Sequence, residues 1–361
     1  MTFSKRYEAF LSRLLSAEGA GPEGSRPRCA LALALLLAAS SAAADNVSVI
    51  KFATLAPDGS TWMKVLTELS KDLEKETGGK LKFKFYPGGV AGDEKDVVKK
   101  IRIGQLHGAG FTGVGLGEVA PETRLLDAPW LFRSRSELEL VRAKYAKELN
   151  AAVEKGGFVL LGWTDLGSVY IFSKNPIAAP EDMRKEKMWV WEGDPIAQAA
   201  YTALGVNPIP LSVVDVMQSL QTGMINGVYG PPLGVVALQW HSKLKHIYPV
   251  PIAESTGAVL VSKKFYDALP GDQKKILTEL AVKHLKRLNE QTNTENDKAL
   301  EALKKQGLDL AADPGPATRR KYEELGSGAR KELAGKLFSA TLLGKFEKEL
   351  AALRARSAKK S

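Results

Sequence analysis

The chain has 361 residues, of which 44% are hydrophobic, 25% charged and 7% aromatic, a composition typical of a globular protein. This length predicts two domains or one large one, with enough chain for a sizeable core. The single cysteine, Cys29, excludes an internal disulfide, a zinc ribbon and any cysteine-paired redox motif. The net charge is +10, but 51 basic and 41 acidic residues are interspersed, which indicates a mixed solvated surface and no nucleic-acid partner.

The first 44 residues have the pattern of a secretory signal peptide. Arginines precede an apolar run over residues 29–39, and small residues follow it up to Ala44. We expect cleavage after Ala44, which removes Cys29 with the leader and leaves no lipid acceptor. No later stretch approaches the ~18 uninterrupted apolar residues that a membrane span needs, so the sequence predicts an exported, soluble protein.

Strand and helix patterns alternate in the segment that follows. Ser60 is placed to cap a helix, and residues 80–86 alternate strictly between apolar and lysine positions, as in a half-buried strand. Together the patterns predict strands over residues 47–54, 80–86 and 107–112 and helices over residues 62–76 and 93–105. This order implies a parallel sheet flanked by helices.

A second α/β set occupies the middle of the chain. Its predicted helices cover residues 136–154, 195–204, 213–222 and 233–244, and its predicted strands cover residues 158–163, 169–173, 187–191, 225–229 and 256–262. Residues 272–306 contain neither Gly nor Pro, which predicts a single helix or two joined end to end. One helix of that length would span roughly 50 Å, so it must brace more than one lobe. Residues 313–361 predict a peripheral helical hairpin with a frayed end.

A glycine-rich segment at residues 108–113 matches the G-x-G-x-x-G dinucleotide fingerprint literally. That mechanism requires a preceding strand and a helix that opens within the motif. Here a helix precedes the segment, and Gly115, Gly117 and Pro121 argue against a helix immediately after it. We therefore expect a close-packed strand end that enters a cleft.

No catalytic or metal-binding pattern is visible. The chain has no Walker loop, no G-x-S-x-G elbow and no H-E-x-x-H motif, and the nearest two of its four histidines are five residues apart, on different faces of a helix. The sequence therefore predicts no metal site, no cofactor and no enzyme activity.

Aromatic residues in turn-rich contexts are the more informative feature. Trp189 and Trp191 alternate on one predicted strand, so both indoles point to the same side of the sheet. Five of the six tryptophans lie at or near the ends of predicted elements, and ligands of α/β sheets bind beyond the carboxyl ends of strands. Core packing and ligand contact remain equally open for any one tryptophan.

Five segments occur in the order of a known family. They are Thr-Leu-Ala-Pro at 54–57, Tyr-Pro-Gly-Gly-Val-Ala-Gly at 86–92, Ala-Pro-Trp-Leu-Phe-Arg at 128–133, Leu-Gly-Val-Asn-Pro-Ile-Pro at 204–210 and Ser-Leu-Gln-Thr-Gly-Met-Ile-Asn-Gly at 219–227. With them the chain resembles the DctP-type solute receptors of TRAP transporters from about residue 47 to 310. The resemblance implies a two-lobed periplasmic-binding-protein fold with a central cleft, which closes on a solute and delivers it to a sodium-driven membrane permease.

This resemblance also implies a division of the chain. We expect lobe I over residues 45–165, lobe II over 166–255, a return strand and the long lobe-spanning helix over 256–312, and a C-terminal helical extension over 313–361. The hinges are expected near residues 163–165 and 253–256, where the chain passes between lobes.

Two departures from the family concern its ligand. Trp189 stands where the usual receptors carry an Arg that binds a substrate carboxylate, and Gly230 stands where they carry an Asn. Tryptophan cannot replace the bidentate hydrogen bonds of a guanidinium. A minority branch shares this loss and is associated with a periplasmic tetratricopeptide-repeat partner, and residues 189–195 resemble that branch.

The sequence therefore predicts a periplasmic receptor for a small apolar or amphiphilic ligand. Its expected ligand-binding residues are Trp62, Phe111, Thr112, Trp189, Trp191, Tyr229 and Pro231. The alternative within transport is a conventional carboxylate receptor that uses Lys187 or Arg124. An enzyme and a structural protein that docks to the repeat partner are the alternatives from other classes.

Overall fold

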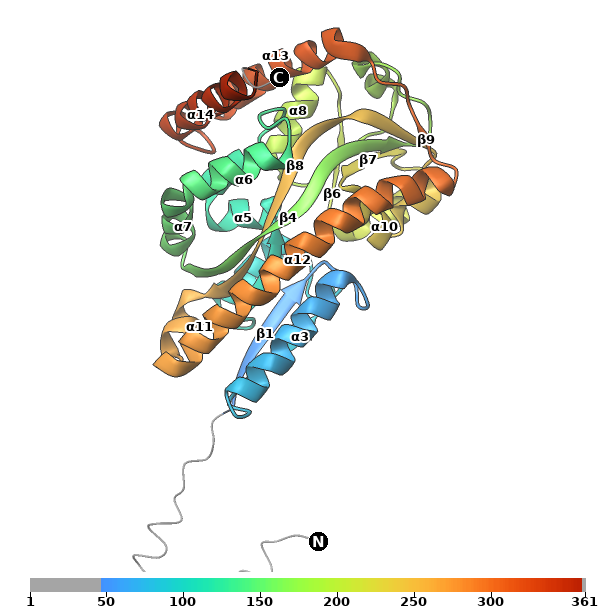
Figure 1. Cartoon of the computed structure of the whole chain (residues 1–361). Coiled ribbons are helices and arrows are strands. Elements are labelled where there is room, and N and C mark those ends of the chain that lie inside the picture. The colour runs from blue at the N-terminus through green and yellow to red at the C-terminus, as the bar shows by residue number, and fades with distance from the viewer. Residues whose placement is uncertain (1–46, 359–361) are drawn as a thin grey trace, which may run out of the picture. The chain divides into compact units, whose positions relative to one another are not determined.

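The computed structural model describes residues 47–358, which Figure 1 shows as a ribbon. The predicted signal peptide, residues 1–44, lies outside the described residues. The main sheet has the strand order β2-β1-β3-β8-β4-β7, with β9 paired to β8, and β5 and β6 form a second sheet. The strands are β1 (Ser48–Thr54), β2 (Leu81–Tyr86), β3 (Gly108–Thr112), β4 (Phe158–Ser173), β5 (Trp189–Trp191), β6 (Ile209–Leu211), β7 (Gly227–Gly230), β8 (His246–Ser262) and β9 (Asp309–Leu310).

Helices cover both faces of the main sheet. The α-helices are α3 (Thr61–Glu76), α4 (Glu94–Arg102), α5 (Gly113–Val119), α6 (Arg135–Lys144), α7 (Ala146–Lys155), α8 (Pro195–Leu204), α9 (Val216–Thr222), α10 (Pro232–Ala237), α11 (Lys263–Ala268), α12 (Gly271–Lys305), α13 (Gly315–Leu333) and α14 (Ala340–Ala358). Residues 47–358 also form four 3₁₀ helices, which are η1 (Pro121–Asp127), η2 (Pro180–Lys185), η3 (Val213–Asp215) and η4 (Trp240–Lys243).

The first three strands form the predicted parallel arrangement, since β1 pairs in parallel with β2 and with β3. Ser60 caps α3 as expected, because its side chain accepts a hydrogen bond from the Met63 N–H at 3.3 Å. Leu66, Leu69 and Leu73 then lie at helical spacing on the buried face of α3. Further along the sheet the pairing becomes antiparallel, at β3–β8, β4–β8 and β4–β7.

Two long strands, β4 and β8, run side by side through the middle of the molecule (Figure 1). The sequence predicted two strands over residues 158–173, but the structure has one strand, β4, with irregular register between Asp165 and Gly167. Gly167 has a φ of +106°, a conformation that glycine adopts without strain, so the strand bends there without ending. The two expected hinge segments meet in this ladder, where Asp165 pairs with Thr256.

Helix α12 confirms the prediction of one long helix, with 35 residues from Gly271 to Lys305. It packs against α3 near one end and α10 near the other, and it crosses β4 between them (Figure 1). Two asparagines fasten it to β4. Asn289 accepts from the Asp165 N–H at 3.0 Å, and Asn296 donates to the Leu166 carbonyl at 2.9 Å.

Three predicted helices have breaks that the sequence did not reveal. The helix expected over residues 136–154 divides at Tyr145 into α6 and α7, and the ring centroid of Tyr145 lies 5.0 Å from that of Phe346 in α14. The helix expected over residues 233–244 ends at Ala237, and Gln239, with a φ of +62°, separates it from η4. The helix expected over residues 213–222 begins as the 3₁₀ turn η3.

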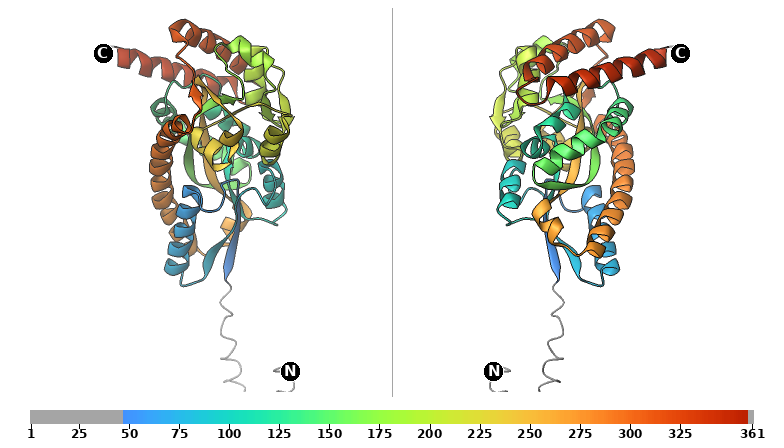
Figure 2. Two further views of the ribbon diagram at one scale, coloured as in Figure 1. Left: turned by 90° about the vertical axis from the view of Figure 1, so that its right-hand side faces the viewer. Right: turned by 90° about the vertical axis from the view of Figure 1, so that its left-hand side faces the viewer.

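The C-terminal segment forms the expected pair of helices, α13 and α14, at one end of the molecule (Figure 2). Leu343, Phe346 and Leu350 of α14 are buried in one cluster with residues of η1 and α6. Arg354 donates to both carboxylate oxygens of Glu137 at 2.8 and 2.7 Å. The hairpin therefore shares a core with the rest of the chain and is less peripheral than the sequence suggested.

Candidate ligand-binding cavity

A cavity of about 570 Å³ lies between two sides of the molecule. We call the walls from β1, β3, α5 and η1 the β3 side, and those from β5, β7, α8 and α10 the β5 side. All seven residues expected to bind a ligand line this cavity: Trp62, Phe111, Thr112, Trp189, Trp191, Tyr229 and Pro231. Sequence reasoning thus brought together residues that are up to 169 positions apart (62 to 231).

Four aromatic rings, which we call the aromatic wall, form the lining on the β5 side. Trp189 stacks on Tyr229 with ring centroids 4.8 Å apart, meets Trp240 edge-to-face at 5.3 Å and lies 6.0 Å from Trp191. Trp189 is only 1% exposed, and its indole N–H donates to the Leu211 carbonyl at 3.0 Å. The two roles left open for this tryptophan are therefore not exclusive, because it packs in a core cluster and lines the cavity.

Asp93, at the start of α4, joins the two sides beside the cavity. Its Oδ2 accepts from the Trp191 indole N–H at 2.9 Å, from the Ser212 hydroxyl at 2.6 Å and from the Val213 N–H at 3.4 Å. The other oxygen, Oδ1, is buried without a partner among the described residues. The indole of Trp191 is thereby fixed in orientation by a residue from the opposite side.

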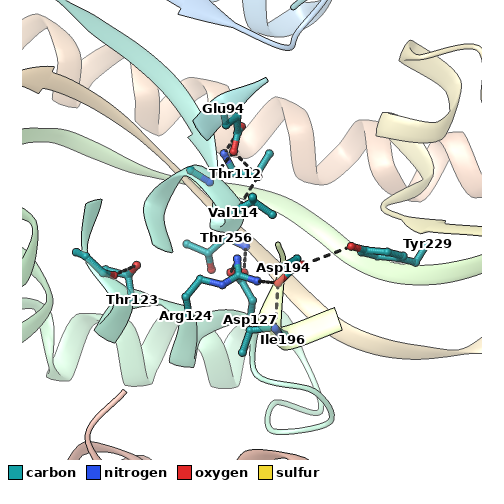
Figure 3. A network of polar contacts seen from close by, with 12 residues as sticks. Glu94, Thr112, Val114, Thr123, Arg124, Asp127, Asp194, Ile196, Tyr229 and Thr256 are labelled. Atoms are coloured by element: carbon teal, nitrogen blue, oxygen red, sulfur yellow. Dashed lines mark hydrogen bonds and ion pairs between the residues drawn. The ribbon is translucent and has the colours of Figure 1, made fainter. Parts of the chain in front are cut away.

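A buried ionic group, which we call the arginine cluster, also lines the cavity, and Figure 3 shows its polar contacts. Arg124 of η1 donates from Nη1 to Asp127 at 2.9 Å and from Nη2 to Asp194 at 2.6 Å. Asp127 also accepts from the Thr256 N–H at 2.8 Å, and the Tyr229 hydroxyl donates to Asp194 at 3.3 Å. Burial raises the pKa of Asp127 to about 6, although Arg124 lowers it.

Glu94, the first residue of α4, is a second buried carboxylate, which we count with the β3 side, and it has no cationic partner among residues 47–358. It accepts from the Thr112 N–H and hydroxyl, both at 2.8 Å, and from the Gly115 N–H at 2.7 Å (Figure 3). Burial raises its pKa to about 7 despite these three donors. The Glu94 carboxylate therefore accepts the hydrogen bonds of the backbone N–H groups at the start of α5.

The expectation that no helix follows the glycine-rich segment is wrong, since α5 begins at Gly113. A Cβ at Gly113 would overlap Asp127 and Arg124, and a Cβ at Gly115 would lie 2.8 Å from Glu94 Oε2. The glycines thus make room for buried charged side chains, and this packing outweighs their poor helix propensity. The strand end itself is closely packed, as expected, because a Cβ at Gly108 would lie 2.6 Å from the Leu260 carbonyl oxygen.

Lys187 does not line the cavity. It is exposed, and its Nζ donates to the Gly223 carbonyl at 3.2 Å. Arg124, the other cation named in the carboxylate alternative, does line the cavity. Gly230, the other position at which the sequence analysis expected a departure from the family, lines it as well.

The lining residues that sequence reasoning did not name include the charged or aromatic side chains of Glu94, Asp127, Asp194 and Trp240. Asp194 carried a local signal, because it precedes Pro195 and caps α8 by accepting from the Ile196 N–H at 3.0 Å. The other three carried none, because their roles arise from contacts between segments distant in the chain.

Among residues 47–358, no group of three or more His, Cys, Asp and Glu side chains is arranged to hold a metal ion. Within the same range, no helix combines the length and apolarity that crossing a membrane requires.

Comparison with known proteins identifies relatives over most of the chain. The profile of the DctP family, described as bacterial extracellular solute-binding protein, family 7, matches residues 52–325. A solute-binding protein of Verminephrobacter eiseniae is 26% identical over 242 residues, which are 66% of this chain and 72% of the relative. The C4-dicarboxylate-binding periplasmic protein DctP of Rhodobacter capsulatus is 25% identical over 316 residues, 86% of this chain and 94% of the relative.

Solved structures share the fold. A TRAP periplasmic solute binding protein of Citrobacter koseri with bound D-glucuronate has a TM-score of 0.76 at 24% identity, covering 84% of this chain and 99% of that one. The sugar acid binding protein of Advenella mimigardefordensis in complex with galactonate reaches 0.78 at 21% identity, with coverage of 84% and 99%. These matches bear out the predicted two-lobed fold with its cleft. Because the family profile matches more than half of the chain, the protein belongs to bacterial extracellular solute-binding protein family 7, a family of periplasmic receptors for transport and not of enzymes.

Proposed function

We propose that this TRAP-type receptor binds an amphiphilic small molecule, holds its apolar body against the aromatic wall and delivers it to a membrane permease. The observation that carries the proposal is Trp189, which lines the cavity at the centre of that wall and which the resemblance places at the family's carboxylate-binding Arg. Apolar surface removed from water contributes roughly 25 cal/mol per Å², so aromatic rings favour an apolar ligand body.

The relatives argue for a polar group on that ligand. Those named above bind a C4-dicarboxylate, D-glucuronate and galactonate, all of which carry carboxylates. None of them supports an entirely apolar ligand. We therefore favour the amphiphilic form of the prediction, with the polar end of the ligand near the arginine cluster.

A conventional carboxylate receptor is the second candidate, and the same relatives favour it. Its remaining cation is Arg124, since Lys187 lies outside the lining. Arg124 already forms ion pairs with Asp127 and Asp194, and these two negative charges beside it weaken this candidate.

The ligand can be identified by mass spectrometry of small molecules that co-purify with the exported protein. Trp189→Ala should then weaken binding of that molecule by about 2 kcal/mol, which is typical of an aromatic anchor. Phe172→Ala is the matched control, because Phe172 is fully buried in the same core cluster as Trp189 but does not line the cavity. Equal loss of thermal stability in both variants, with affinity unchanged in both, would reduce Trp189 to a packing role.

The partners follow from the family and from the branch that the sequence resembles. We propose a TRAP-type permease as the recipient of the ligand and a periplasmic tetratricopeptide-repeat protein as an additional partner. Residues 189–195, which resemble that branch, include Trp191 and Asp194 of the cavity. Cross-linking in cells that express both proteins tests the second partner, and capture of the permease alone would remove it.

Export is the remaining part of the proposal. Sequencing of the periplasmic protein should begin at Asp45, with no acyl group on the chain. A mature protein that retains Cys29 with a lipid mass would contradict cleavage after Ala44.

A further inference from the structure

A short helix of the β5 side, α10, begins a continuous part of the cavity lining. Every residue from Leu233 to Trp240 lines the cavity. The helix itself has only six residues, Pro232–Ala237, and a helix of that length is not stable on its own in water. Contacts with the rest of the chain must therefore hold this part of the wall in place.

The N-terminus of α10 has no cap from its own segment. Pro231 and Pro232 begin the helix, and a proline has neither a backbone N–H nor a side chain that can accept a hydrogen bond. The first N–H of the helix is that of Leu233, and it donates to Oδ1 of Asn296 at 3.1 Å. Asn296 belongs to α12, so the long helix supplies the cap that the α10 segment lacks.

The other end of the same amide holds β4 and α12. Nδ2 of Asn296 donates to the Leu166 carbonyl at 2.9 Å and to the Thr292 carbonyl at 3.0 Å. Leu166, Thr292 and Leu233 all line the cavity, whereas Asn296 is 5% exposed and is not part of the lining. One buried side chain thus joins three elements of the wall from outside the cavity.

The backbone of β4 leaves room for this side chain. Gly167 lies where the register of the β4–β8 ladder is irregular, and a Cβ there would come within 2.7 Å of Cγ and Nδ2 of Asn296. Any larger residue would therefore displace the amide, in addition to the strain that the φ of +106° would impose on it. The amide consequently connects the bend of β4 to α10.

We propose that Asn296 is a positioning residue of the ligand site, which fixes α10 to α12 and to the bend of β4 and so holds the α10 wall against the ligand. This inference rests on the proposed function, because it takes the cavity as the place where the ligand binds. Its expected effects are separate from those of the aromatic wall, since Asn296 does not line the cavity.

Asn289 provides the matched control for Asn296. It lies about two turns earlier on α12, and it accepts from the Asp165 N–H at 3.0 Å and donates to the Trp163 carbonyl at 3.1 Å. Both hydrogen bonds therefore join α12 to β4, as those of Asn296 do, but they do not reach α10. Neither Asn289 nor its two partners line the cavity.

The test compares Asn296→Ala with Asn289→Ala by hydrogen exchange and by binding of N-phenyl-1-naphthylamine, an uncharged fluorescent probe with two aromatic groups. In Asn296→Ala the amides of residues 233–237 should exchange at least about tenfold faster, because α10 has lost its cap. The probe should bind about tenfold more weakly, which corresponds to 1.4 kcal/mol. In Asn289→Ala both quantities should stay within about twofold of the unmodified protein.

The two measurements distinguish a failure of this inference from a failure of the proposed function. Equal effects of the two variants, or faster exchange with unchanged probe affinity, would overturn the positioning role and leave the proposed function intact. If the probe does not bind the unmodified protein, the proposed function is contradicted, and the exchange rates alone decide whether Asn296 positions α10. If Asn296→Ala does not fold, the Leu233 amide of the unmodified protein decides, because exchange at the rate of an unprotected amide would contradict its hydrogen bond to Asn296.

Discussion

The two sides of the cavity accommodate buried polar and charged groups in opposite ways. On the β3 side, glycines at 113 and 115 let whole charged side chains pack against α5, and each charge has its own donors or counter-ions. On the β5 side, indole and phenol rings form an apolar wall and direct single polar atoms to fixed acceptors. Changes on the β3 side should therefore affect folding, whereas changes on the β5 side should affect ligand binding.

The largest effect is expected from Gly113→Ala, which adds a methyl group at the most closely packed glycine of the β3 side. The new methyl group would overlap Asp127 and Arg124 and separate a buried ion pair, at a cost of about 3–5 kcal/mol in the free energy of unfolding. Urea denaturation measures the loss. Gly344→Ala in α14 is the control, because a Cβ there has no neighbour within 4 Å and should stabilise the helix by about 1 kcal/mol.

Glu94→Gln tests whether the buried carboxylate on the same side titrates as its surroundings dictate. A pKa of about 7 in the folded chain, above the ordinary 4.5, means that the folded state holds this proton more tightly than the unfolded state does. The stability from Glu94 is then complete below pH 4.5 and lost as pH rises through 7, a difference of about 3 kcal/mol.

Chemical denaturation between pH 4.5 and 8 measures how the free energy of unfolding changes with pH, both in the unmodified protein and in Glu94→Gln. The substitution should flatten this pH dependence, and the remainder should come from groups such as Asp127, whose pKa is raised to about 6. The charge of Asp93 acts on the pKa of Glu94, and the charges of Arg124 and Asp194 act on the pKa of Asp127. An equal pH dependence of the free energy of unfolding in Glu94→Gln would show that Glu94 is ionised in the folded protein over this whole pH range.

Asp93→Ala breaks the connection between the two sides. It removes the acceptor of the Trp191 indole and of the Ser212 hydroxyl, so we expect a loss of about 1–2 kcal/mol in stability. X-ray scattering should also detect a larger radius of gyration, since this contact holds the sides together. Asp96→Ala, on the same helix but at an exposed ion pair with Lys99, should change neither quantity.

The smallest effect is expected from Lys187→Ala. Lys187 is exposed and lies outside the cavity, so ligand affinity and stability should change by less than about 0.5 kcal/mol. A large loss of affinity would revive Lys187 as a carboxylate ligand and would require the β5 side to be rearranged when the ligand binds.

The sequence predicted the α/β order, the long helix and the pair Trp189 and Trp191 of the β5 side, because each follows from local periodicity or from residues two positions apart on a strand. It could not predict the arginine cluster. Asp194 meets Arg124 across 70 positions, and nothing in the local pattern of either residue indicates that contact. The contact between Tyr145 and Phe346 of α14, at the break between α6 and α7, likewise joins residues that are distant in the chain.

The same distinction explains the glycine-rich segment. Local propensity argued against a helix after residue 113, and that expectation was wrong because burial decided the outcome. The glycines accommodate two buried acids and a guanidinium, so their meaning is visible only when the side chains that fill the space are known.

The ladder between β4 and β8 has a mechanical consequence for ligand release. Residues 163–165 are paired with residues 256–258, and Asn289 of α12 accepts from the Asp165 N–H and donates to the Trp163 carbonyl. Three segments are thus linked at the place where the sides of the molecule meet. Because the two strands are hydrogen-bonded to each other and α12 is hydrogen-bonded to β4, we expect opening to bend these three segments together.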